Sequence, residues 1–213
     1  NIDRRGARAV LSSLKQANEF RPNLEEVEQF IREDPSPRAI FLNSPHNPTG
    51  GITLQEDLEG LAELIRDTNI AVLSDEPYDR MVWSGEHRSL AAIPGMLDRT
   101  VAAYTFSKSF SMSGWRLGFA VSSPAIIEML GKLTNSALSC VAPFTQLAGV
   151  AAMQEACDER DRQMEEFRHK VVRLVERLNR VEGITCLVPG GRFYAFPSVA
   201  PICNRLGITS QGL

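Results

Sequence analysis

The chain has 213 residues, of which 43% are hydrophobic and 23% are charged, and its formal net charge is −3. This is the composition of an ordinary soluble globular protein, and the length allows one sizeable core or two small domains. The small negative charge provides no basic field for nucleic acid, and no apolar run is long enough to cross a membrane. Because the first twenty residues lack a signal-peptide pattern, a cytoplasmic location is the default expectation.

The four cysteines and three histidines are scattered along the chain. They form neither a Cys-x-x-Cys pair nor the Cys/His spacing of a metal site. The sequence therefore predicts reduced thiols and no bound metal.

The first part of the chain alternates between apolar runs and helical periodicity. Capping-box patterns that begin at Asn23 and Thr53 predict the starts of two helices. Residues 39–42 and 70–73 have the pattern of buried strands. This strand-loop-helix-strand order is typical of a parallel sheet, in which ligands bind beyond the carboxyl ends of the strands.

The remaining elements follow from the same periodicities. Residues 7–11 are consistent with a strand, and 80–98 with an irregular connection anchored by Trp83 and Leu90. Further strands are expected over 101–104, 117–121 and 192–196, and helices over 124–135, 144–157 and 158–181, with another helix starting near Thr209 or Ser210. The apolar stripe of the long charged helix is predicted to be Phe167, Val171, Leu174 and Leu178, and the apolar face of the helix after Thr53 to be Leu54, Leu58, Leu61, Leu64 and Ile65.

Residues 105–118 form a loop rich in hydroxyls between two predicted strands. A lysine such as Lys108 becomes a nucleophile when desolvation or a nearby cation lowers its pKa. Arg116 offers a planar fork that suits a phosphate, and the hydroxyls of Thr105 and Ser107 can complete the shell of that anion. Taken alone, the loop is equally consistent with a solvated lysine and serines that only form turns.

Two other segments follow predicted strands: Asn-Ser-Pro-His-Asn-Pro-Thr-Gly at 43–50 and Ser-Asp-Glu-Pro-Tyr-Asp at 74–79. With the lysine loop they resemble, in order, the three signatures of fold-type I aminotransferases of the aspartate aminotransferase superfamily, which use pyridoxal phosphate. The resemblance runs over most of the chain but corresponds to about half of a full family member, so a segment of a longer protein is expected.

The resemblance implies an α/β fold with a mainly parallel sheet between helices. Residues 1–185 would be part of the large, cofactor-binding domain, and residues 186–213 the beginning of a small α+β C-terminal domain. The N-terminal phosphate loop, the ring that stacks on the cofactor and the arginine for the substrate's α-carboxylate would lie outside this segment.

The resemblance also assigns roles to individual residues. Lys108 would form the Schiff base and then carry the proton between substrate and cofactor. Asp75 would pair with the pyridine nitrogen, for which the adjacent Glu76 is an alternative that the Asp75-x-x-Tyr78 spacing disfavours. The phenolic oxygen would be bound by Asn47 and Tyr78, and the phosphate by Thr105, Ser107 and Arg116.

Arg192 stands where the family more often has a small or apolar residue. We hypothesise that it faces the mouth of the active site and interacts with an acidic or carboxylated substrate.

The expected function is transfer of an amino group between an amino acid and a 2-oxo acid by a homodimer. Two alternatives stay open: a C–S lyase or synthase of the same fold, and a non-catalytic sensor domain of a transcription regulator. The sequence does not choose the amino-acid substrate.

Overall fold

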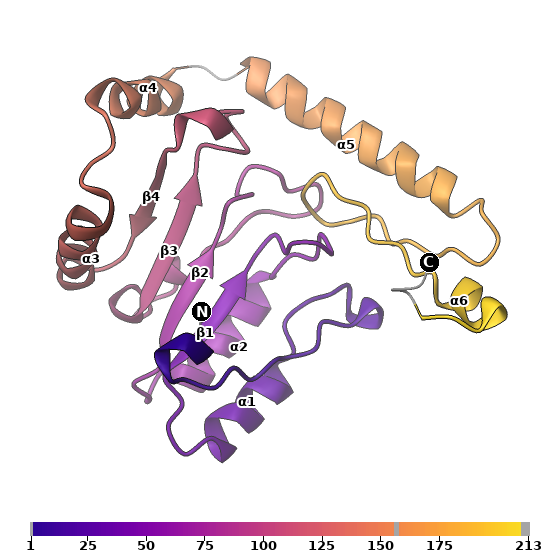
Figure 1. The fold of residues 1–213 in the computed structure, drawn as a ribbon, viewed down its shortest axis with the longest axis horizontal. Coiled ribbons are helices and arrows are strands. Elements are labelled where there is room, and N and C mark those ends of the chain that lie inside the picture. The colour runs from indigo at the N-terminus through magenta and orange to yellow at the C-terminus, as the bar shows by residue number, and fades with distance from the viewer. Residues whose placement is uncertain (1, 156–157, 210–213) are drawn as a thin grey trace.

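The computed structural model describes residues 2–155 and 158–209. Four strands and six α-helices are assigned in this part of the chain (Figure 1). The strands are β1 (Ala39–Asn43), β2 (Ala71–Asp75), β3 (Thr100–Thr105) and β4 (Gly118–Val121). The helices are α1 (Leu24–Glu33), α2 (Gln55–Ile65), α3 (Pro124–Leu138), α4 (Pro143–Gln154), α5 (Asp158–Leu178) and α6 (Ala200–Leu206).

The strands form one sheet in the order β1-β2-β3-β4. The first three are parallel and β4 runs antiparallel to β3, which confirms the predicted α/β fold with a mainly parallel sheet. In the register, Asn43 pairs with Asp75, Asp75 with Ala103, and Thr105 with Gly118. The carboxyl ends of β1, β2 and β3 and the start of β4 therefore meet at one edge of the sheet.

One face of the sheet carries the main core. Leu58, Leu61 and Ile65 of α2 are buried against Leu42 and Val72 of the strands, as the helical spacing predicted. Burying each of these side chains stabilises the fold by roughly 1.5–3 kcal/mol.

The opposite face of the sheet is open among the described residues. Phe41 there is 63% exposed and Leu73 41% exposed. In Figure 1, α3 and α4 lie beside the β4 edge, and α5 extends past the carboxyl ends of β1 and β2.

The two predicted helix caps differ in outcome. The Asn23 side chain accepts a hydrogen bond from the Glu26 N–H at 3.3 Å, as predicted, but the Glu26 carboxylate binds the N–H of Ser13 instead of closing the box. The second cap lies one residue later than predicted, at Leu54, whose N–H donates to Asp57 at 2.9 Å. Arg21 binds the same Asp57 carboxylate at 2.7 and 2.9 Å, which favours a helix start at this position.

Two predicted strands are wrong. Residues 7–15 have no regular structure and no neighbouring strand. Residues 192–197 form no ladder and are flanked only by isolated bridges, Val82 to Gly191 and Thr185 to Ser198. The physical reason at the second site is Arg192, whose φ of 71° takes the chain out of the extended conformation.

Helix α3 continues to Leu138 instead of ending near residue 135, whereas α4 and α5 are shorter than predicted. The buried stripe of α5 also differs. Its buried residues are Met164, Val171 and Val175, whereas the predicted Phe167 and Leu174 are 38% and 46% exposed. The helix turns this side inward because it packs on Cys186 and on residues 193–195. Helix α4 ends before Cys157, which lies outside the described residues, as does Ser210 of the last predicted helix start.

Helix α6 was not predicted, and the division at residues 185 and 186 stays a prediction. Within the described ranges, no helix is both long and apolar enough to cross a membrane.

Candidate active site at the carboxyl ends of the strands

Asn43 joins two of the predicted site segments. It is the last residue of β1, and its side-chain amide donates to the backbone oxygen of Asp75 at 2.8 Å and to the Asp75 carboxylate at 3.2 Å. Its side-chain oxygen accepts from the N–H of Asn47 at 2.8 Å. Asn43 therefore fixes the loop of Asn47, whose own side chain is exposed, relative to Asp75. The residues predicted from the sequence to form the site do not include Asn43. Its position at the end of β1, which matches that of Asp75 at the end of β2, is the signal that could have found it.

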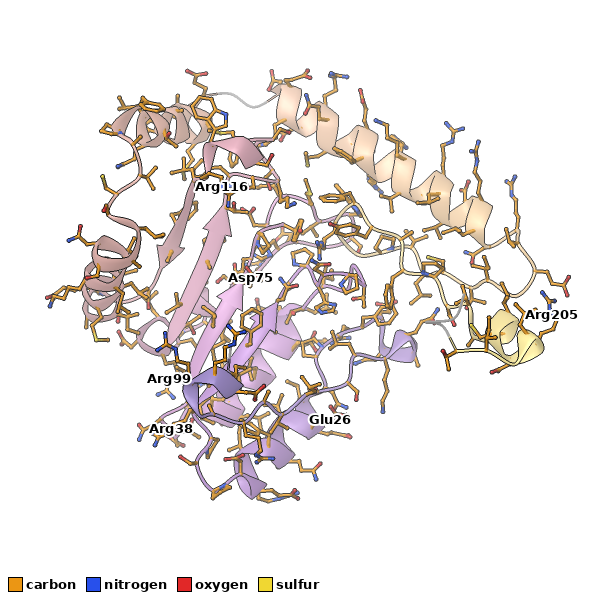
Figure 2. The ribbon with its side chains drawn as sticks, viewed as in Figure 1. Glu26, Arg38, Asp75, Arg99, Arg116 and Arg205 are labelled. Carbon is orange, nitrogen blue, oxygen red and sulfur yellow. The ribbon has the colours of Figure 1, made fainter. Side chains whose placement is uncertain are left out.

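The Asp75 carboxylate lies half-buried at the end of β2 (Figure 2). Burial raises its pKa, the nearby Arg192 guanidinium acts in the opposite direction, and the neighbouring charge of Glu76 raises it further. A carboxylate in this setting gains from a cationic ligand that pairs with it.

The adjacent Glu76 is bonded to other protein groups. Its buried carboxylate accepts hydrogen bonds from the hydroxyls of Ser74 and Ser89 at 2.7 Å each, and from the Tyr104 hydroxyl at 2.6 Å. The His87 ring nitrogen lies 2.8 Å from Oε2, the oxygen that also accepts from Tyr104. Glu76 thus connects β2 and β3 to the irregular segment 80–98, and Asp75 is the carboxylate left for a ligand.

An aromatic wall borders the lysine. Tyr78 is buried beside Met81, and its ring contacts Phe193 edge-on with centroids 5.9 Å apart. The Lys108 amine lies 5.9 Å from the Tyr78 centroid and 5.6 Å from that of Phe193. These rings and the backbone of the loop position the amine beyond the end of β3.

The lysine loop begins with two adjoining hydroxyls. The Thr105 hydroxyl lies 3.0 Å from that of Ser107 and accepts the Ser107 N–H at 3.1 Å. Arg116, at the far end of the loop, is exposed and donates to the backbone oxygen of Ser113 at 2.8 Å. Because Thr105 pairs with Gly118, two residues after Arg116, both loop ends reach the same edge of the sheet (Figure 2). Hydroxyls and a guanidinium at one edge are suitable donors for a phosphate.

The fold and this edge define an α/β protein that gathers an amine, a free carboxylate, a phenol and hydroxyl groups beyond its parallel strands. The model of the family described as aminotransferase class I and II matches residues 1–206, so the chain belongs to this family, the fold-type I family whose members use pyridoxal 5′-phosphate.

Individual aminotransferases are similar to this chain in sequence and in structure. The chain is 35% identical to an aspartate aminotransferase of Pyrococcus abyssi over 97% of its own length and 52% of that protein. It is 34% identical to an aromatic-amino-acid aminotransferase of Thermococcus litoralis over 91% of its length and 50% of that protein. Among solved structures, an aspartate aminotransferase of Rhizobium meliloti superposes with a TM-score of 0.86 at 30% identity, covering 92% of this chain and 49% of that one. The chain thus spans about half the length of the relatives it matches.

The residues present fit the family's cofactor by their chemistry. The cofactor needs an amine for its aldehyde, a carboxylate for its ring nitrogen, a donor for its phenolic oxygen and donors for its phosphate. Lys108 could supply the amine, Asp75 the carboxylate and Tyr78 the donor to the phenolic oxygen. The hydroxyls of Thr105 and Ser107 could supply part of the phosphate site.

Proposed function

We propose that the protein containing this chain is a pyridoxal-phosphate-dependent aminotransferase that moves an amino group between an amino acid and a 2-oxo acid. The observation that supports the proposal is that Asp75 ends β2 while the Lys108 amine, beyond the end of β3, lies 5.9 Å from the Tyr78 ring centroid. The names of the relatives, aspartate and aromatic-amino-acid aminotransferases, support the reaction class.

The cofactor, when bound, would supply an electron sink for the bond broken at the substrate's Cα. Lys108 would anchor it covalently and, once released, would move the proton at Cα as general base and acid. The Tyr78 and Phe193 rings border the amine and limit where it can lie.

The other residues would orient the cofactor. Asp75 would hold the proton on the ring nitrogen through a charge-assisted hydrogen bond of roughly 1.5–3 kcal/mol. Tyr78 and Asn47 would bind the phenolic oxygen, and Thr105, Ser107 and Arg116 the phosphate.

Lys108 provides the first test. The full-length protein, loaded with pyridoxal phosphate and treated with borohydride, should carry the reduced cofactor on the peptide containing Lys108. Lys108→Ala should lose this label and at least about 1000-fold in activity, because the same amine acts as nucleophile and as base. Lys132 is a matched control, since it is exposed and paired only with Glu128. A label on another lysine, or none, would refute the proposal.

The reaction class needs a separate measurement. An aminotransferase given an amino acid without an acceptor should release one equivalent of 2-oxo acid and retain the nitrogen on the cofactor. Steady release of ammonia would instead indicate elimination, and the absence of any turnover would indicate a sensor.

We also propose that the full-length protein is a homodimer, as the family resemblance implies. Helices α3 and α4 expose large apolar side chains that need cover in the whole protein; they are Met129, Leu133, Leu138, Phe144, Leu147 and Met153. Sedimentation equilibrium of the full-length protein should give twice the chain mass, and a monomer at micromolar concentration would contradict this assignment.

A further inference from the structure

The Arg192 side chain is fully buried, with an exposed fraction of 0%. Its Nε, Nη1 and Nη2 atoms make no hydrogen bond to any described residue. The guanidinium carbon lies 3.5 Å from the Tyr78 ring centroid and 4.6 Å from that of Tyr194, so two aromatic rings border the cation. Ring contacts of this kind recover only about 0.5–2 kcal/mol, whereas an unpaired buried charge costs several times more.

The backbone holds this side chain inside. The Arg192 N–H donates to the oxygen of Met81 at 2.7 Å, and its carbonyl accepts from the indole N–H of Trp83. The preceding Gly191 N–H donates to the oxygen of Gly50 at 3.1 Å. Arg192 also has a φ of 71°, in the left-handed region that costs a residue with a side chain roughly 1–2 kcal/mol. Strain and an unpaired charge at one residue point to a functional role.

The position of the guanidinium relates it to the proposed reaction site. The guanidinium lies on the Tyr78 ring, whose centroid is also 5.9 Å from the Lys108 amine. The charge of Asp75 acts on Arg192, although no carboxylate is within hydrogen-bond distance of its nitrogens. The other titratable groups that act on it are Tyr78, Tyr194 and His46.

A ligand can bring the anion that this guanidinium lacks among the described residues. A guanidinium presents a planar fork that matches a carboxylate in a bidentate pair. The Asp75 carboxylate is proposed above as the partner of a ring cation, and the hydroxyl cluster at Thr105 and Ser107 as part of the phosphate site. The remaining anionic group in the proposed reaction is a carboxylate of the amino acid or 2-oxo acid.

We propose that Arg192 binds a carboxylate of the substrate and thereby determines which substrates the site accepts. This inference rests on the proposed aminotransferase function. The carboxylate is a second one, on the side chain of a dicarboxylic substrate, because the arginine for the α-carboxylate is expected outside this segment.

The test uses the cofactor-loaded full-length protein and two unreactive probes, succinate and butyrate, titrated by calorimetry. Arg192→Gln should weaken succinate binding about 10- to 100-fold, the worth of a hydrogen bond to a charged group. Arg192→Lys keeps the positive charge but loses the planar fork, so its affinity for succinate should lie between those of the wild type and Arg192→Gln. The Michaelis constants for a dicarboxylic and a monocarboxylic amino acid should change in the same ratio as the two probes.

A matched control is Arg99, a part-buried arginine at the other end of the sheet that already donates to the backbone oxygens of Ile65 and Thr68 (Figure 2). Arg99→Gln should lower stability without changing either probe's affinity.

The outcomes separate cleanly. Weakening confined to succinate would support a side-chain carboxylate at Arg192, and equal weakening of both probes would overturn the inference. Unchanged affinities for both probes would overturn the inference, as would a variant whose only change is in the pH dependence of the bound cofactor's absorbance. If Arg192→Gln does not fold, Arg192→Lys decides by the same criteria. Absence of the borohydride label on Lys108 in the wild type would instead refute the proposed function itself.

Discussion

Asp75 and Glu76 are adjacent carboxylates with different surroundings. A cationic ligand would stabilise the half-buried Asp75 carboxylate, whereas the Glu76 carboxylate already contacts four polar groups of the protein. One residue is therefore suited to binding a ligand, and the other to holding β2, β3 and the segment 80–98 together.

Substituting each carboxylate by its amide should separate the two roles. Asp75→Asn should reduce turnover by about 100- to 1000-fold, because it removes one preorganised electrostatic partner, without lowering the stability of the cofactor-free protein. Glu76→Gln should instead lower the free energy of unfolding by about 1–3 kcal/mol through weakened hydrogen bonds. Urea unfolding and steady-state kinetics on both variants test this. Equal stability loss in the two variants would contradict the assignment.

At the scale of elements, the turn at residues 189–191 positions the site. It contacts two loops that follow β1 and β2: Gly191 donates to Gly50, and Gly190 accepts from Trp83 and Ser84. A Cβ atom on Gly191 would lie 2.6 Å from the oxygen of Met81, so only glycine allows this approach. The turn thereby fixes where Arg192 and Phe193 meet Tyr78.

Gly191→Ala should consequently destabilise the protein by about 1–3 kcal/mol through overpacking, and should also weaken cofactor binding. Gly131 in α3 offers a control of opposite sign, since nothing lies within 4 Å of its Cβ position. Gly131→Ala should stabilise by up to about 1 kcal/mol through helix propensity. Thermal unfolding of both variants, with and without cofactor, measures the contrast. If Gly191→Ala left the stability unchanged, the turn would be free to move away from the oxygen of Met81.

For the whole molecule, the buried cluster around Glu76 predicts how stability depends on pH. Burial alone would raise the pKa of Glu76, but the hydrogen bonds from His87, Ser74, Tyr104 and Ser89 outweigh it and hold the pKa below its usual range. In the unfolded chain a glutamate titrates near pH 4.3, roughly its model-peptide value. The stabilisation is therefore complete above that pH and is lost as the pH falls toward the folded-state pKa.

The free energy of unfolding, measured in urea from pH 7 to pH 3, should thus fall more steeply for the wild type than for Glu76→Gln. The two curves should approach each other as the pH falls toward the folded-state pKa of Glu76. Parallel curves over this range would show that Glu76 has the same pKa in the folded and unfolded states.

The sequence by itself determined the elements whose cause is local. Apolar runs identified β1 to β4 because these strands are short and continuous, and helical spacing identified the buried face of α2. Three motifs after predicted strands resemble those of fold-type I aminotransferases, and this resemblance predicted the fold class.

Only the tertiary structure decided features that depend on residues far apart in the chain. Residues 192–197 look like a strand but have no partner strand, because backbone bonds to Met81 and Gly50 fix the turn before them. The buried side of α5 depends on Cys186 and Phe193, which periodicity within the helix does not contain. The unpaired guanidinium of Arg192 belongs here too: its burial arises from rings contributed by two separate segments, and no local pattern encodes it.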